Sequence, residues 1–185
     1  MGEAKRRQQQ EIETFLEIMK PWIGPTSAWE KNVVREISQL PVVHVCRLPL
    51  HTLADMGMEP NCCHENCAWL EENDPHRRAR SITGWLRDPT GNYVLHAVIL
   101  VNGKFTCITP TTYVNVEGFD FVPDIKIVIS RTSEGDFRFC RDGHPIGAGV
   151  RVDPAATIAY LERIKQRLEE GMPLADAMSI PFEHD

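Results

Sequence analysis

The stretch NCCHENCAWL, residues 61–70, holds three of the six cysteines of this 185-residue chain, with one histidine among them. Pro60 and Asn61 are typical of a helix start, so we expect a helix from Cys63 to about Glu72. A thiol in the first turn of a helix lies at the positive end of the helix dipole, which favours the thiolate. The stretch therefore indicates a nucleophile or a metal ligand, although small, soft side chains also fill cores.

The composition predicts one globular domain, residues 1–185, with a formal net charge of −6. This acidic balance argues against a general nucleic-acid-binding protein, which normally shows a basic face. We expect no membrane partner, because no window is apolar over the length of a membrane span, and no secretory signal in the polar N-terminus. Six cysteines are too few for a disulfide scaffold, so we expect a cytoplasmic protein with free thiols.

The periodicity of apolar residues predicts an α+β order of elements. Two helices are expected in residues 1–40, the second capped by Thr26 or Ser27, and an α+β core in residues 41–150. A last long helix is expected in residues 151–185, starting at Asp153 or Pro154. Within the core we expect strands over residues 41–48, 81–86, 93–101, 104–109, 125–130 and 137–140, and an irregular segment over residues 49–60.

Two positions on the predicted strands carry imidazoles. His44 and Cys46 share one face of the first strand, where a structural histidine is the favoured interpretation. His96 lies on the strand that the turn Asn102-Gly103 joins to the strand of Cys107, so His96 and Cys107 are expected to be near neighbours. A thiol at a helix start and an imidazole on an adjacent strand form the arrangement needed for nucleophilic acyl chemistry.

Several short motifs in this order resemble a known superfamily. The residues are Cys63-His64-Glu65-Asn66, then Ala79 to Trp85, His96-Ala97-Val98, and Cys107-Ile108-Thr109-Pro110. They resemble the core of the transglutaminase-like, papain-related cysteine enzymes. They resemble more closely a set of uncharacterised bacterial and phage proteins with a Cys-His-x-Asn motif, a later His-Ser/Ala-Val strand and an Asp-Ile-Thr-Pro end. The resemblance covers about residues 60–112 and implies a papain/transglutaminase-like core, in which the cysteine helix packs on an antiparallel sheet.

The resemblance also implies roles for individual residues. Cys63 would be the nucleophile and His96 the base and acid, with Asn66 and Cys107 completing the catalytic set. Substrate contacts would come from His64, Trp85 and Thr109, although His64 is also interpretable as structural and Trp85 as core. One departure stands out, because Cys107 occupies the position of the aspartate that would orient the histidine. Another acceptor could replace it (Asn115, Asp120 or Asp124), the Cys63–His96 pair could act alone, or the site could be inactive.

The leading hypothesis is a thiol-dependent amide hydrolase or acyltransferase, of the peptidase, amidase, deamidase or cross-linking type. It would act on protein or peptide amides without a cofactor, and a thiol-directed probe would label Cys63 first. Two alternatives stay open: a non-catalytic binding protein on the same fold, and a zinc-binding version of it. The candidate zinc ligands are Cys63, Cys67, His96, Cys107, Cys140 and His144. Three residues separate Cys63 from Cys67 and Cys140 from His144, whereas the common zinc knuckle has two residues between its ligands.

Overall fold

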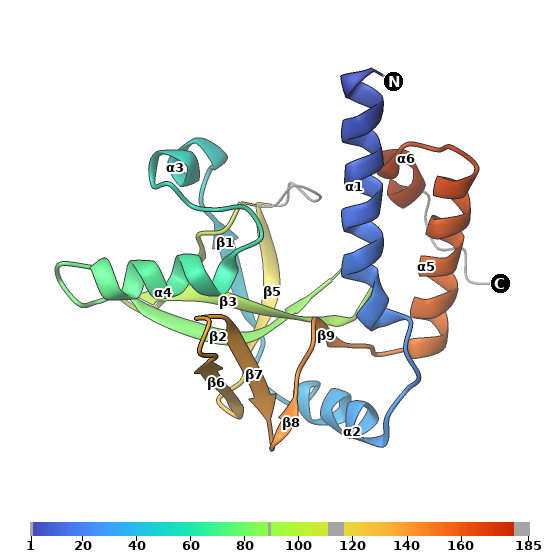
Figure 1. Cartoon of the computed structure of the whole chain (residues 1–185). Helices are drawn as coiled ribbons and strands as arrows, with labels where there is room; N and C mark the ends of the chain where they lie inside the picture. The colour runs from blue at the N-terminus through green and yellow to red at the C-terminus, as the bar shows by residue number, and fades with distance from the viewer. Residues whose placement is uncertain (1, 89, 111–116, 180–185) are drawn as a thin grey trace.

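The structure of the protein is a computed structural model that describes residues 2–88, 90–110 and 117–179. Its α+β class is as expected (Figure 1). The helices are α1 Glu3–Met19, the 3-10 helix η1 Lys20–Trp22, α2 Ala28–Ile37, α3 Leu50–Asp55, α4 Cys63–Asn73, α5 Pro154–Glu169 and α6 Leu174–Ser179. The strands are β1 Val43–Arg47, β2 Arg80–Arg87, β3 Tyr93–Val101, β4 Lys104–Cys107, β5 Gly118–Pro123, β6 Ile127–Arg131, β7 Phe137–Arg141, β8 His144–Pro145 and β9 Gly149–Val150.

Five strands form a closed barrel. They run in the order β2-β5-β1-β4-β3, and pairing between β2 and β3 closes the ring. The short strand β9 pairs with the first two residues of β3, Tyr93 and Val94. The strand β1 pairs parallel with β4, and the other described pairings in this sheet are antiparallel. The barrel is therefore mixed, where the sequence predicted an antiparallel sheet. A long crossover that contains α3, α4, β2 and β3 lets β1 and β4 run in the same direction.

Helix α4 lies across β2 and β3 on the outside of the barrel (Figure 1). The side chains between α4 and the barrel are small or aliphatic, and Cys67 of α4 packs there with Ala97 and Ile99 of β3. Alternation along β3 turns Val98 the other way, into the barrel, where it packs with Cys107 and Phe121. The two faces of β3 thus belong to two separate hydrophobic clusters.

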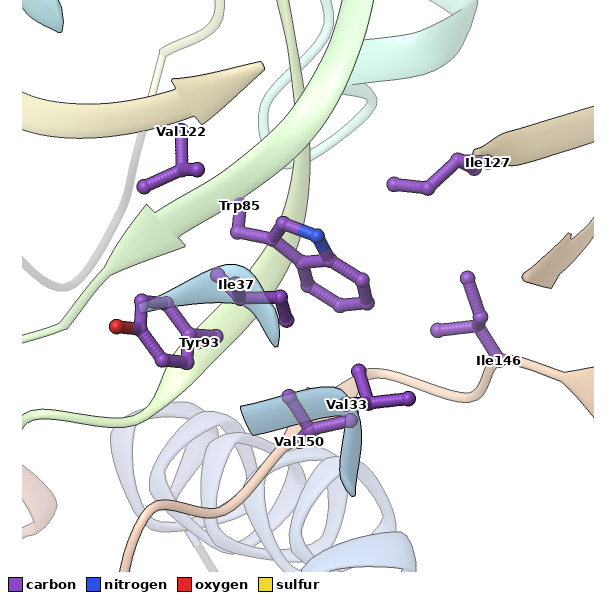
Figure 2. Close-up of a cluster of buried hydrophobic side chains, with 8 residues drawn as sticks. All are labelled: Val33, Ile37, Trp85, Tyr93, Val122, Ile127, Ile146 and Val150. Atoms are coloured by element: carbon purple, nitrogen blue, oxygen red, sulfur yellow. The ribbon is translucent and has the colours of Figure 1, made fainter. Parts of the chain in front are cut away.

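Trp85 is the largest fully buried side chain and lies at the centre of a third cluster, where α2 packs on the barrel. Figure 2 shows its indole surrounded by aliphatic side chains. The indole Nε1 donates to Asp124 at 2.8 Å, so its polar atom is satisfied inside the protein. The other members are Val33, Ile37, Tyr93, Val122, Ile127, Ile146 and Val150.

The N- and C-terminal helices form a layer beside the barrel (Figure 1). Phe15 of α1 packs against Leu161 and Ile164 of α5 and Leu174 of α6. None of the helices in the described residues is both long and apolar enough to cross a membrane.

Two buried ion pairs join elements that are far apart in sequence. Arg151, just after β9, contacts the Glu30 carboxylate of α2 at 2.8 Å. Arg141 of β7 contacts Asp124 at 2.7 Å, and both side chains are almost fully buried. The second pair joins the small sheet β6-β7-β8 to the end of β5.

The helices and strands largely follow the predicted pattern, with one short helix and three strands in addition. Ser27 caps α2 and accepts from the Glu30 N–H, as one of the two predicted caps. Residues 50–55 form the short helix α3 instead of an irregular segment. The strands β5, β8 and β9 were not predicted, because two of them have only two residues and β5 begins at Gly118 and ends at Pro123, which read as turn signals.

Candidate active site

Cys63 is the first residue of α4 and lies on the outer side of β3. The N-cap is Cys62, which makes no side-chain capping bond. Asn61, part of the predicted helix start, lies one position earlier and has a left-handed φ of 60°. The sulfur of Cys63 packs with the cluster beneath α4 and accepts a hydrogen bond from the Ala97 backbone. Burial nevertheless raises the pKa of the Cys63 thiol to about 12, and the Ala97 bond offsets this only in part. The resting group is therefore a neutral thiol.

His96 is on β3, directly before Ala97, and points into the barrel. Its Nε2 lies 3.5 Å from the Cys107 sulfur, and its ring meets the edge of Phe119 at a centroid distance of 5.4 Å. The ring is 8% exposed, and burial, helped by nearby His64 and Arg47, lowers the pKa of His96 to about 3. The imidazole is therefore neutral at physiological pH.

The hydrogen bonds of Cys107 favour one tautomer of His96. The Cys107 thiol donates to the Thr109 carbonyl at 3.8 Å, so its sulfur is left to accept from Nε2–H of the ring. Assigned in this way, the lone pair of His96 is on Nδ1. Cys107 thus occupies the orienting position next to His96, as a neutral acceptor in place of a carboxylate.

Cys63 and His96 approach β3 from opposite faces. Cys63 packs with Ala97 and Ile99, whereas His96 shares the barrel interior with Cys107. Among the described residues, no direct hydrogen bond joins the Cys63 thiol to the His96 ring, whose hydrogen-bond partner is Cys107. Proton transfer between the two would use Nδ1 of His96, the nitrogen that Cys107 leaves unoccupied.

Asn66 and Thr109 tie the start of α4 to the end of β4. The Asn66 amide donates to the Glu59 carbonyl at 2.9 Å and accepts from the Glu59 N–H at 3.1 Å. It also reaches the Thr109 hydroxyl at 3.5 Å, and both side chains are buried. Their bonds hold the loop before Cys63 in place, which is a positioning role.

Neither of the two described alternative acceptors, Asp120 and Asp124, has His96 as its partner. Asp124 accepts from Trp85 and from Arg141, so its carboxylate is committed to that buried pair. Asp120 lies 3.6 Å from the ring of a different histidine, His44, on the exposed face of the barrel. Asn115 lies outside the described residues.

The remaining predicted substrate contacts, His64 and Trp85, both lie on the outer side of the barrel. The His64 ring packs against Phe139 at 4.2 Å between centroids and against Phe137 at 6.0 Å, both from β7. Burial lowers the pKa of His64 to about 4, and its Nε2 is buried with no hydrogen-bond partner among the described residues. Trp85 is 0% exposed, so its indole lies in the core and not on a surface open to substrate.

The six candidate zinc ligands do not come together as one set. Cys67 is on the buried face of α4, and burial raises the pKa of its thiol. Cys140 and His144 are in the small sheet, where the His144 ring packs against Trp29 at 5.6 Å. Within the described residues, no three His, Cys, Asp or Glu side chains are arranged to hold a metal ion. The residues present therefore do not fit a zinc site.

One contact of the candidate site was not predicted from the sequence. The backbone of Ala97 bonds to the Cys63 sulfur, because β4 ends at Cys107 and β9 reaches only Tyr93 and Val94 of β3. No side chain signals such a gap in pairing, which depends on where neighbouring strands end.

Comparisons of the chain with family models, with curated proteins and with solved structures found no match.

Proposed function

We propose that this protein is a thiol-dependent amide hydrolase or acyltransferase, of the peptidase, amidase, deamidase or cross-linking type. Cys63 is the nucleophile and His96 the base and acid, on a core of the papain/transglutaminase type. The observation that carries the proposal is the Cys107 contact at Nε2 of His96, which leaves Nδ1 of the neutral ring unoccupied on β3, the strand that Cys63 contacts. The substrate is a protein or peptide amide.

The neutral state of both groups defines the mechanism. His96 takes the proton from the Cys63 thiol as its sulfur adds to the carbonyl carbon of the amide, because no thiolate is present beforehand. The carbon–nitrogen bond then breaks, and the imidazolium returns the proton to the leaving amine. Water or a second amine attacks the resulting thioester, which frees Cys63. Substrate binding has to bring the thiol and Nδ1 together, since catalytic hydrogen bonds often tighten only in the complex.

A peptidyl fluoromethyl ketone tests the proposal. Its carbon is a weak electrophile, so it reacts chiefly with a nucleophile in a site that binds the peptide. We expect one adduct at Cys63, found by peptide mass mapping. Cys63→Ser should abolish it, and His96→Gln should slow it by about a hundredfold, the lower end of the range for general acid–base catalysis. The matched control is Cys62→Ser, which removes the neighbouring thiol and should leave the adduct unchanged. An adduct that forms equally fast in the His96→Gln variant would contradict the proposal.

A second candidate is a non-catalytic binding protein on the same fold. It is favoured by the thiol at position 107 and by the separation of Cys63 and His96 on the two faces of β3. A neutral sulfur stabilises an imidazolium much less than a carboxylate does. The same experiment separates the two functions, because an inert site gives no adduct at Cys63 at any peptide concentration.

A further inference from the structure

A second cluster of a cysteine, a histidine and a carboxylate lies on the exposed face of the barrel. His44 and Cys46 are two residues apart on β1, and both are exposed. Asp120 lies opposite His44 on the antiparallel neighbour β5, and Gly118 lies opposite Cys46. The side chains of His44 and Asp120 are 65% and 59% exposed, so this cluster is open to solvent.

The His44 ring spans the space between the carboxylate and the cysteine. Its Nδ1 lies 3.6 Å from Asp120 Oδ1. Its other nitrogen, Nε2, lies above Gly118, since a Cβ built at that glycine would be 2.7 Å from it. Cβ atoms of directly opposed residues are ~5 Å apart in an antiparallel pair, and Cys46 is the residue opposed to Gly118. Nε2 therefore lies over the residue opposed to Cys46, on the same face of the barrel as the Cys46 side chain.

The absence of a side chain at position 118 creates this arrangement. Any larger residue there would occupy the volume that the His44 ring fills, and would separate the ring from Cys46. The carboxylate of Asp120 favours the proton on Nδ1, which leaves the lone pair on Nε2, the nitrogen above Gly118. A thiol, a base and a group that orients the base thus follow one another across two strands.

We propose that Cys46 is a surface thiol activated by His44 and Asp120, and that it is a site of modification by low-molecular-weight disulfides. Nε2 of His44 takes the proton of the Cys46 thiol as its sulfur attacks one sulfur of the disulfide. The sulfur–sulfur bond of the reagent breaks, and the leaving thiolate takes the proton back from the imidazolium. The products are a mixed disulfide at Cys46 and one free thiol, so Cys46 is oxidised and half of the reagent is reduced.

This site is independent of the proposed function. Cys63 and His96 lie beneath α4 and inside the barrel, whereas Cys46 lies on the outer surface of β1. The other five cysteines lack full exposure, so Cys46 is also the thiol that a soluble reagent reaches first.

The test is the rate at which oxidised glutathione modifies Cys46 in the full chain, followed by peptide mass mapping and reversed with a reducing agent. We expect His44→Gln to lower this rate about tenfold, and free imidazole in solution to restore part of it. Asp120 is a positioning residue, so Asp120→Asn should lower the rate and Asp120→Glu should recover it. His76→Gln, which removes an exposed histidine from the loop before β2, is the matched control and should have no effect.

Two further variants test whether the adduct forms at Cys46 and whether its rate depends on the position of the His44 ring. Cys46→Ser should abolish the adduct without a change in the circular dichroism spectrum, because its side chain is exposed. Gly118→Ala should lower the rate by displacing the His44 ring. Equal rates at Cys46 in the His44→Gln and His76→Gln variants would overturn the proposal, and so would an imidazole effect of the same size in both.

Discussion

Replacement of His96 by Gln should make the protein less sensitive to acid. The folded protein holds the pKa of His96 at about 3, against an ordinary value of 6.5. Below pH 6.5 the unfolded chain therefore binds a proton that the folded protein does not bind, and the free energy of unfolding falls as the pH decreases toward 3. Each pH unit in this window costs about 1.4 kcal/mol, so at pH 5 the buried imidazole lowers the stability by about 2 kcal/mol relative to neutral pH.

The assay is urea unfolding followed by tryptophan fluorescence at pH 7 and at pH 5. The wild-type protein should lose about 2 kcal/mol more than the His96→Gln variant between these two pH values. Loss of the ring also changes packing against Phe119, but that cost is the same at both pH values and cancels in the difference. His51→Gln, at an exposed position in α3, is the control and should keep the wild-type pH dependence. If His96→Gln lost as much stability as the wild type, the imidazole could not be the neutral buried group described above.

Three further predictions concern the core and the thiols. Asp124→Ala should lower the free energy of unfolding by about 3 kcal/mol in urea. It leaves the buried Trp85 indole N–H and the Arg141 Nε without their acceptor, at about 1–3 kcal/mol each, while Arg141 keeps its contacts with Glu36 and Asp142. Gly84→Ala should lower the melting temperature sharply, since a Cβ at that position would overlap the backbone of the adjacent strand β5. Iodoacetamide at neutral pH should label Cys46 well before Cys63, as burial keeps the Cys63 thiol protonated; peptide mapping that found Cys63 labelled first would show an activated thiolate there.

Local patterns in the sequence were sufficient for most of the helices and strands. Asn102 and Gly103 form the predicted hairpin turn, with φ values of 51° and 78°, and they place Cys107 next to His96. The cap at Ser27 was equally readable, because a capping box depends on residues three positions apart. These features share one property, which is that their partners are close in sequence or reached through a tight turn.

Features whose partners are far apart in sequence could not be predicted from local patterns. The closure of the barrel, and the placement of Asp120 and Asp124, depend on β5, which pairs with strands far from it in sequence. Sequence reasoning could name both aspartates as candidate partners of His96, but only the register shows that one faces His44 and the other Arg141. The expected order of labelling also changed, since a helix dipole favours thiolate at Cys63 while burial beneath α4 opposes it and is the larger effect.

The residue at position 107 affects both the charge of His96 and the stability of the barrel. A carboxylate there would lie among Val45, Val98 and Phe121, where it would need a positive partner to offset the cost of burial. A protonated His96 could be that partner, so a carboxylate would raise the pKa of the ring and its own charge would be compensated. A thiol needs no such partner, and it leaves His96 neutral. Cys107 thus fits a stable barrel better than it fits an imidazolium, and the proposed chemistry at Cys63 depends on a base that must act from the neutral state.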